Sequence, residues 1–363
     1  MLKPQKRYGF EPDYAIPPGE TLKEVMESLN MSQKELAIRT GVTVQTINRI
    51  FKGEQPISYE TSNKLELATG VPARMWNNLE AQYREQLAKL KERKQLEFES
   101  GWLKNIPVNE LIQRKAIEPK DDKTLILRET LKFFGVSSVA AWHEIWSQPE
   151  VAARRSHCFE TRPGPAATWI RIGEIQAQQI ECRDYSKNQF YKVLAKIRGL
   201  TVKRPEEFIP EMISLCAGSG VALALVPEMK KVPWYGATKW LSATKAMILL
   251  NLRRKAEDQF WFSFFHEAGH VLNDSKKDLF INDGKEEDPN ERKANAFAAE
   301  FLIPFTYDRV INSLKSKADV IRIAKELQIA PGIVAGRFQH LTNKWSYFKD
   351  LIRSFHWAKI DYS

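Results

Sequence analysis

The chain has 363 residues, a length that exceeds one comfortable hydrophobic core and predicts two or three domains. Its hydrophobic content of 43% and charged content of 28% are typical of an ordinary soluble globular protein. No uncharged apolar run reaches the roughly 18 residues of a membrane span, and the start lacks a signal peptide's apolar core. We therefore expect a cytoplasmic protein with no membrane partner. The net charge of +10 is compatible with a nucleic-acid partner but does not establish one.

The cysteines exclude two further classes. Cys158, Cys182 and Cys216 are odd in number, widely spaced and without a C-x-x-C pair. Neither a disulfide framework nor a thiolate zinc site is therefore indicated. We interpret them as small buried apolar side chains.

The first segment, to about residue 80, has the spacing of a helix-turn-helix bundle. After a helix over 21–29, Ser32 is placed to cap a second helix, and Glu35 to complete a capping box. Gly41 makes the turn, and Thr43 caps a third helix, VQTINRIFKG, which ends at a glycine.

The third helix has one polar face. Ile47 and Ile50 point inward, whereas amide, hydroxyl and guanidinium groups point out, the chemistry that meets base edges in a major groove. Gln33 and Lys52 are placed for phosphate contacts. The predicted DNA-contacting residues are Gln33, Thr43, Gln45, Thr46, Asn48, Arg49 and Lys52. The alternative is a helical bundle used only for protein contact.

The second segment, about 81–200, begins as a charged helical stretch, EAQYREQLAKLKERKQLEFES. Amphipathic pieces such as TLILRETLKFFGV and PAATWIRIGEIQAQQIECRDY follow, with Gly and Pro mostly between them. This pattern predicts a helical connector rather than a flexible linker.

The third segment, from 201, changes character. PEEFIPEMISLCAGSG predicts a helix ended by glycine, and VALALV and KAMILLNL predict β-strands, with WYGATKWL between them. FWFSFFHEAGHVL predicts a helix that is apolar on nearly every side and hence buried. The fold class expected is mainly α with an α+β C-terminal domain, divided as 1–80, 81–200 and 201–363. A second helix-turn-helix-like run, ADVIRIAKELQIAPGIVAGRFQHL, closes the chain, and we interpret it as packing beneath the third domain's site.

The buried helix carries the pattern H-E-x-x-H. His266 and His270 are four residues apart, so both imidazoles project from one helix face at a spacing that can bind one ion. Zn²⁺ accepts imidazole nitrogen, and a catalytic site leaves one position for water. Glu267 can take the proton of that metal-bound water as a general base. Alternatively, the two histidines are only hydrogen-bonded, but a polar cluster in so apolar a helix is costly without compensation.

A third protein ligand is expected downstream, in DPNERKANAFAAEFLIP. Glu291 and Asn295 share one helix face, which predicts Glu291 as the ligand and Asn295 as a residue that steadies a ligand. Glu300 lies about half a turn away from Glu291 by the 3.6-residue period and faces elsewhere. A competing role for Glu291 is a capping box with Asp288. The other acidic residues nearby, Asp283, Glu286, Glu287 and Asp288, suit a solvated loop.

The group that stabilises the oxyanion is less defined. Tyr235, Lys239 and His340 are the candidates. Tyr235 is preferred because it lies beside a short strand that can pair with an extended peptide. The alternative for this tyrosine is simple packing.

With these residues placed, SQKELAIRTGVTVQTINRIFKGEQPIS resembles the XRE-type helix-turn-helix of HigA-like antitoxins. FWFSFFHEAGHVL and ERKANAFAAEFLIP resemble the ImmA/IrrE family of zincin-like metallo-endopeptidases. The two resemblances cover about residues 17–80 and 200–340. The family implies zinc bound by His266, His270 and Glu291, with Glu267 as the base. It also implies cleavage of a repressor protein.

Two main functions follow from the resemblance. In the first, a DNA-binding regulator uses zinc, metal-bound water and Glu267 to hydrolyse a regulatory protein, a repressor-type target or toxin–antitoxin partner. In the second, a HigA-like antitoxin or repressor holds structural or sensory zinc and cuts nothing. A third is a module that neutralises a toxin. Operator DNA and a protein are the expected partners, and a homodimer is expected because such readers commonly bind paired half-sites.

Overall fold

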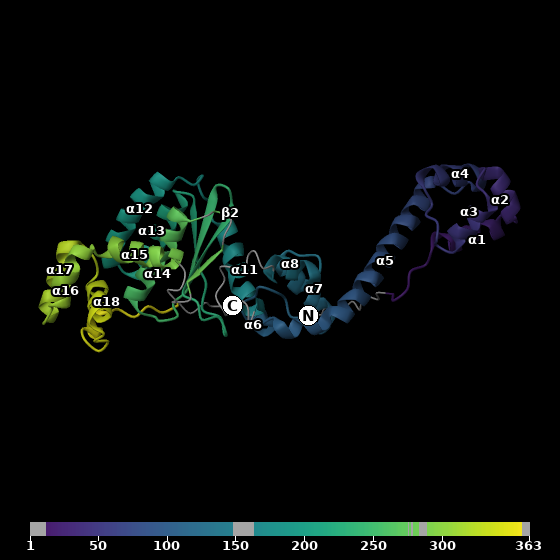
Figure 1. The fold of residues 1–363 in the computed structure, drawn as a ribbon. Helices are drawn as coiled ribbons and strands as arrows, with labels where there is room; N and C mark the ends of the chain where they lie inside the picture. The colour runs from purple at the N-terminus through teal and green to yellow at the C-terminus, as the bar shows by residue number, and fades with distance from the viewer. Residues whose placement is uncertain (1–11, 148–162, 275, 277–278, 283–288, 358–363) are drawn as a thin grey trace, which may run out of the picture. The chain divides into compact units, whose positions relative to one another are not determined.

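The structure, a computed structural model, describes residues 12–147, 163–274, 276, 279–282 and 289–357 (Figure 1). Contacts between residues group the chain into two compact units. Unit 1 is Met1–Gly101 with Asp122–Thr124, and unit 2 is Trp102–Asp121 with Leu125–Ser363.

Unit 1 is a bundle of short helices followed by a long one. A core of buried apolar side chains, including Leu22, Leu36, Ile47 and Trp76, joins the helices. The helices are α1 (Pro18–Ser28), α2 (Gln33–Thr40), α3 (Val44–Phe51), α4 (Tyr59–Thr69) and α5 (Ala73–Glu99). The predicted helix-turn-helix is therefore confirmed.

The turn of this motif forms for local reasons. Gly41 ends α2 at φ 65°, a conformation that a glycine adopts at no steric cost. Thr43 Oγ1 then accepts a hydrogen bond from the Thr46 amide at 3.1 Å and caps α3. Ser32 caps α2 in the same way, at 3.2 Å from the Glu35 amide. The expected capping box is only half formed, because the Glu35 carboxylate pairs with Arg39 at 2.5 Å instead.

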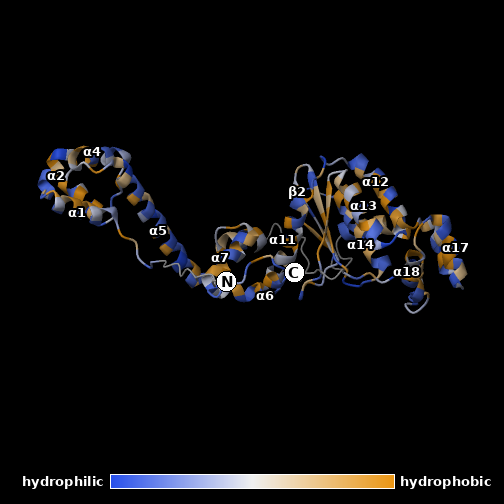
Figure 2. Cartoon of the chain, turned by 180° about the vertical axis from the view of Figure 1, so that it is seen from behind, coloured by the Kyte–Doolittle hydropathy of each residue, from blue (hydrophilic) through white to orange (hydrophobic). Residues whose placement is uncertain are grey.

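The long helix α5 starts at Ala73 and continues to Glu99 without a break at residue 80. Most of its surface is hydrophilic, as the blue ribbon of Figure 2 shows. The start of the charged stretch predicted as a connector thus belongs to the same helix as the end of the bundle.

Unit 2 contains a four-stranded mixed sheet in the order β1-β3-β2-β4. β3 pairs parallel with β1 and antiparallel with β2, and β2 pairs antiparallel with β4. The strands are β1 (Val221–Leu225), β2 (Gly236–Ser242), β3 (Lys245–Leu250) and β4 (Phe280–Asn282). The segment WYGATKWL, to which no strand was assigned from the sequence, contains most of β2.

The other described helices of the chain belong wholly or mostly to unit 2. They are α6 (Val108–Gln113), α7 (Lys123–Phe134), α8 (Val139–Ser147), α11 (Pro163–Gln179), α12 (Lys187–Gly199), α13 (Pro205–Ala217), α14 (Glu257–Asn273), α15 (Pro289–Leu302), α16 (Asp308–Asn312), α17 (Lys317–Leu327) and α18 (Pro331–Thr342). Of these helices, α11, α13 and α14 contact the sheet. Short 3₁₀ turns lie at Ser100–Asn105, Leu200–Val202, Phe305–Tyr307 and Lys349–Leu351. The expected mainly α fold with an α+β C-terminal domain is confirmed.

The two faces of the sheet carry different helices. On β3, Ile248 joins the core around α14, whereas Leu249 contacts α11 so closely that a Cβ on Gly173 would lie 2.7 Å from it. α11 and α12, which fall in the predicted connector, both pack in unit 2: α11 on the sheet and α12 against α13 and α14 (Figure 1). The division at 80 and 200 stays a prediction.

α14 is buried along almost its whole length, as expected from its apolar sequence. α18 packs against α14 and α17, so the second helix-turn-helix-like run forms part of the support beneath this helix. Among the described residues, Cys182 and Cys216 are free thiols, and Cys158 lies outside them. None of the described helices is both long and apolar enough to cross a bilayer.

The C-terminal segment forms hydrogen bonds with the start of α14. Buried Glu257 accepts hydrogen bonds from the Arg353 backbone amide at 2.9 Å and from its Nε at 2.6 Å. Arg353 also donates to the carbonyl oxygens of Thr201 and Lys203. Burial raises the pKa of Glu257, and the Arg353 charge and hydrogen bonds offset part of this effect.

Replacing Arg353 by Met leaves Glu257 buried without its partner. We expect the free energy of unfolding of unit 2 to fall by about 3 kcal/mol. Urea titration followed by tryptophan fluorescence measures the change. The control is Arg322→Met, an exposed arginine 3.9 Å from Asp319, for which at most about 0.5 kcal/mol is expected. Equal losses in both variants would contradict this role for Arg353.

Candidate metal centre and DNA reader

Three polar side chains converge within the otherwise apolar core of unit 2. His266 and His270, on successive turns of α14, are both buried, and Glu291 on α15 lies opposite them. One ligand atom from each of the three lies within 4.8 Å of the other two. The structure thus brings together the three residues that the sequence predicted as metal ligands.

The convergence requires a close approach of α14 and α15. Gly269 lies at the crossing, where an added Cβ would be 3.3 Å from Ala294 Cα and 3.2 Å from Phe297 Cδ1. Ala294 and Ala298, on the inner face of α15, are buried. Small residues on both helices therefore bring the Glu291 carboxylate within reach of the histidines. No local pattern in the sequence marked Gly269 as the point where the two helices cross.

The atoms of the cluster face one another as ligands would. His266 Nε2 is 3.1 Å from Glu291 Oε2, His270 Nε2 is 3.3 Å from Glu291 Oε1, and the two Nε2 atoms are 3.0 Å apart. The capping role considered for Glu291 is not required to explain its position, since both its oxygens are directed at the imidazoles. Its proposed capping partner, Asp288, and the acidic residues Asp283, Glu286 and Glu287 lie outside the described residues.

The other ring nitrogen of each histidine has an oxygen partner. His266 Nδ1 is 2.8 Å from Asn295 Oδ1, and His270 Nδ1 is 2.6 Å from Asp274 Oδ2. Because these oxygens accept, each ring places its hydrogen on Nδ1 and presents the lone pair of Nε2 to the centre. Asn295 was predicted in this position. Asp274 was missed, although its spacing of four residues from His270 was the available signal.

The base candidate Glu267 is held from β2. Its Oε2 accepts a hydrogen bond from Thr238 Oγ1 at 2.7 Å. Its Oε1 is buried and has no hydrogen-bond partner among the described residues. A Cβ on Gly236 would lie 2.6 Å from Oε1, so glycine there leaves room for the carboxylate. Neither Thr238 nor Gly236 was identified from sequence, because no local pattern links β2 to α14.

The electrostatics of the cluster favour a positive charge at its centre. Burial lowers the pKa of His270, but hydrogen bonds to Asp274 and Glu291 and the nearby carboxylates raise it overall to about 10. Burial raises the pKa of Glu291, yet the two histidines lower it overall to about 2. Burial raises the pKa of Glu267, with the histidine charges and Thr238 acting in the opposite direction.

This donor set fits a zinc ion. A bound cation would replace the proton that the raised pKa of His270 favours, and two imidazole Nε2 atoms 3.0 Å apart and a carboxylate would hold it. Two nitrogen ligands and one oxygen ligand are also what catalytic zinc sites use, with a fourth position left open.

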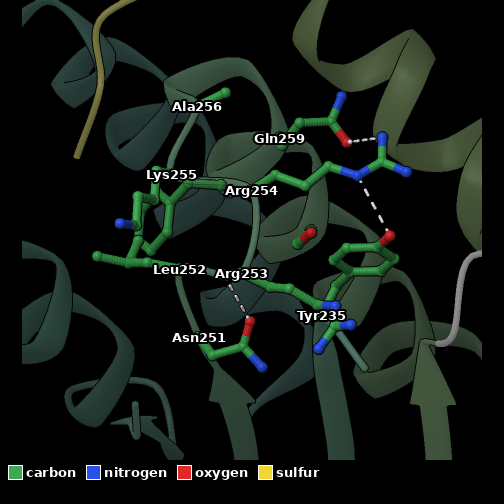
Figure 3. Close-up of a pocket in the computed structure, with 10 residues that line it drawn as sticks. Tyr235, Asn251, Leu252, Arg253, Arg254, Lys255, Ala256 and Gln259 are labelled. Carbon is green, nitrogen blue, oxygen red and sulfur yellow. Dashed lines mark hydrogen bonds between the residues drawn. The ribbon is translucent and has the colours of Figure 1, made fainter. Parts of the chain in front are cut away.

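The candidates for oxyanion stabilisation have other contacts. The Tyr235 hydroxyl accepts a hydrogen bond from Arg254 Nε at 3.2 Å, in a pocket at the start of α14 (Figure 3). Lys239 pairs with Glu174 on α11, and His340 is exposed on α18. No described contact brings any of the three to the histidine cluster, so that role stays a prediction.

The second candidate site lies in unit 1. Gln45, Asn48 and Arg49 are exposed on α3, while Ile47 and Ile50 are buried beneath them, as the sequence predicted. Thr46 is half-buried, and its hydroxyl lies 2.9 Å from that of Thr43.

The two predicted phosphate contacts differ in their surroundings. Gln33, at the start of α2, donates to the Val44 carbonyl at 3.3 Å and so ties α2 to α3. Lys52 is exposed at the end of α3. These positions are compatible with DNA contact, and the individual contacts stay predictions.

Models of two known families match the chain. A helix-turn-helix family model matches residues 22–76, and the model of the IrrE N-terminal-like domain, a metallopeptidase family that is generally zinc-dependent, matches residues 227–339. No curated protein matches the chain. The first match supports DNA binding, and the second supports a peptidase domain. One region of the chain is thus similar to an XRE-type helix-turn-helix, and a second region is similar to an ImmA/IrrE-type domain.

Proposed function

We propose that the chain is a zinc-dependent endopeptidase that hydrolyses a regulatory protein of repressor type and also binds operator DNA. The observation that carries the proposal is the convergence of His266 Nε2, His270 Nε2 and the Glu291 carboxylate within 4.8 Å of one another, beside a buried Glu267. A binding protein with structural zinc would not need a carboxylate with one free oxygen at this position.

His266, His270 and Glu291 would hold the ion, and Asn295 and Asp274 would orient the two imidazoles. A bound Zn²⁺ would lower the pKa of a water molecule and polarise a peptide carbonyl. Glu267 would accept the proton of the attacking water on its free Oε1 and deliver it to the amide nitrogen as the C–N bond breaks. Thr238 would fix the carboxylate through Oε2, so that Oε1 faces the reacting atoms.

The helix-turn-helix suggests where this peptidase would act. A reader with Arg49 and Asn48 exposed on α3 would bring the chain to a particular operator, as a homodimer where the operator has two half-sites. This supports a regulatory rather than a digestive role, with a repressor or a toxin–antitoxin partner as the substrate.

Removal of a ligand should abolish zinc binding. We expect one Zn²⁺ per chain, and a loss of affinity above about 100-fold in His266→Ala, since even indirect supports of a zinc site cost about 10–100-fold. Asn295→Ala should fall within that smaller range. Competition with a chromophoric chelator measures both. His340→Ala, which removes an exposed histidine on α18, is the control. Wild-type affinity in His266→Ala would exclude this centre.

Replacing Glu267 by Gln removes the base without removing a ligand. We expect zinc affinity to stay near the wild-type value and cleavage to fall by about 10²–10⁴-fold. New protein N-termini, counted by mass spectrometry in cells that express either form, report cleavage of an unidentified target. Glu300→Gln, which alters a carboxylate that accepts a hydrogen bond from the Phe305 amide, is the control. Identical cleavage by Glu267→Gln would rule out this mechanism, and no cleavage by any form would favour the non-proteolytic regulator.

Replacing Arg49 by Ala should weaken operator binding by about tenfold or more, because one side chain that contacts a base edge is worth about 1–3 kcal/mol. A duplex selected from random sequence by the wild-type chain, followed by gel-shift titration, provides the measurement. Lys64→Ala, an exposed cation on α4, is the control and should retain nearly full affinity. A similar loss in both variants would indicate charge attraction rather than recognition by α3.

A further inference from the structure

A pocket at the start of α14 lies on the helix face that carries the histidine cluster. Gln259 and Ser263 line it, and His266 and His270 follow at helical spacing. With a rise of about 1.5 Å per residue, Ser263 lies about 4.5 Å and Gln259 about 10 Å from His266 along the axis. A peptide bound at the cluster could therefore reach this pocket.

The pocket is lined by cations and lacks acids. Its described lining residues include three basic side chains and no carboxylate (Figure 3). They are Tyr235, Asn251, Leu252, Arg253, Arg254, Lys255, Ala256, Gln259, Phe260 and Ser263. Such a concentration of positive charge favours an anionic ligand.

Arg254 is the cation that the structure positions for a ligand. Its Nε donates to the Tyr235 hydroxyl at 3.2 Å, and its Nη1 donates to Gln259 Oε1 at 3.4 Å. The guanidinium also lies 5.1 Å from the centre of the Tyr235 ring. Its Nη2 has no hydrogen-bond partner among the described residues. The side chain is thus oriented in advance, with donors left for a ligand.

The loop that carries Arg254 is itself fixed. Arg253 donates through its amide to Asn251 Oδ1 at 3.0 Å and through Nη1 to the Val232 carbonyl at 3.1 Å. The Lys255 carbonyl accepts from the Phe355 amide at 2.6 Å. Arg253 therefore serves the loop, whereas the guanidinium of Arg254 faces the pocket.

Two nearby carboxylates compensate the positive charge of the pocket only in part. Glu257 pairs with Arg353 at 2.6 Å. Asp258 packs against α18, where a Cβ on Gly336 would lie 2.4 Å from its Oδ2; burial raises its pKa, and the charge of Arg254 acts in the opposite direction. Neither belongs to the lining of the pocket.

We propose that Arg254 binds an Asp or Glu side chain of the protein substrate, about three residues from the scissile bond. The distance follows from the separation of about 10 Å and the advance of about 3.3 Å per residue of an extended chain. A guanidinium binds a carboxylate through paired hydrogen bonds, which selects an acid over an amide. Tyr235 is then a positioning residue for Arg254. This proposal rests on the proposed peptidase function, since it assumes a peptide bound at the histidine cluster.

The first test measures binding without cleavage. Zinc-loaded chain carrying Glu267→Gln is titrated into dye-labelled, C-terminally amidated ten-residue peptides with mixed residues around one central Glu or Gln. We expect the Glu peptides to bind about tenfold more tightly, and Arg254→Gln to remove that difference. Arg322→Gln, which removes an exposed cation on α17 outside the pocket, should preserve it.

Several outcomes would overturn the proposal. One is a preference for Glu that survives Arg254→Gln. Another is that a Gln peptide made with a free C-terminal carboxylate binds as tightly as the amidated Glu peptide, which would mean capture of a chain end. A third is a loss of duplex DNA affinity in Arg254→Gln with peptide binding unchanged, which would assign the pocket to phosphate.

The second test uses the active, zinc-loaded chain on a peptide digest of a cell extract. We expect cleaved sequences to be enriched in Asp and Glu about three residues to one side of the cut, and Arg254→Gln to reduce this enrichment to the background frequency. Cleavage without enrichment in the wild-type chain overturns the proposal and leaves the peptidase function intact. Absence of all cleavage counts against the peptidase function, while the binding comparison still decides the role of Arg254.

Discussion

The close approach of α14 and α15 is the constraint on which the candidate centre depends. Two histidines on one helix supply only two ligand atoms, and the third must come from another element. Gly269 and Ala294 allow that element to come near enough for the Glu291 oxygens to lie 3.1 and 3.3 Å from the imidazoles. A larger side chain at either position would separate the helices and disperse the cluster, even with every ligand present.

This cluster is costly to bury, and its neighbours reduce the cost. Asn295 and Asp274 satisfy the outer nitrogens of the two imidazoles, and Thr238 satisfies one oxygen of Glu267. The groups that face inward are the two Nε2 atoms, the Glu291 carboxylate and Glu267 Oε1, which has no hydrogen-bond partner among the described residues. A cation together with a polar substrate would satisfy these groups. The atoms that are costly to bury in the apolar core are therefore the ones that suit a metal-dependent reaction.

The sequence predicted those parts of the fold that depend on local periodicity. The caps at Ser32 and Thr43, the turn at Gly41 and the burial of α14 each follow from a few neighbouring residues, as does the inward face of α15. Contacts between distant segments could not be predicted in this way. Thr238 and Gly236, for example, lie about 30 positions before Glu267. The strand β2 was not recognised because the segment WYGATKWL, which contains most of it, mixes small, charged and aromatic side chains. The sequence of α11 likewise does not reveal that this helix covers the sheet.

β2 and the residue before it contact the base candidate Glu267, the helix α11 and the pocket residue Arg254. They can do so because successive side chains of a strand point to opposite faces. Gly236 and Thr238 face α14 and hold Glu267, whereas Lys239 faces α11 and pairs with Glu174. Tyr235, directly before the strand, holds Arg254 at the pocket. A shift of this strand by one residue would exchange its two faces, so the register of β2 on β3 fixes the base, the support of the sheet and the pocket together. Specificity and catalysis in this domain would therefore share one structural element, and a change that moves β2 would alter both.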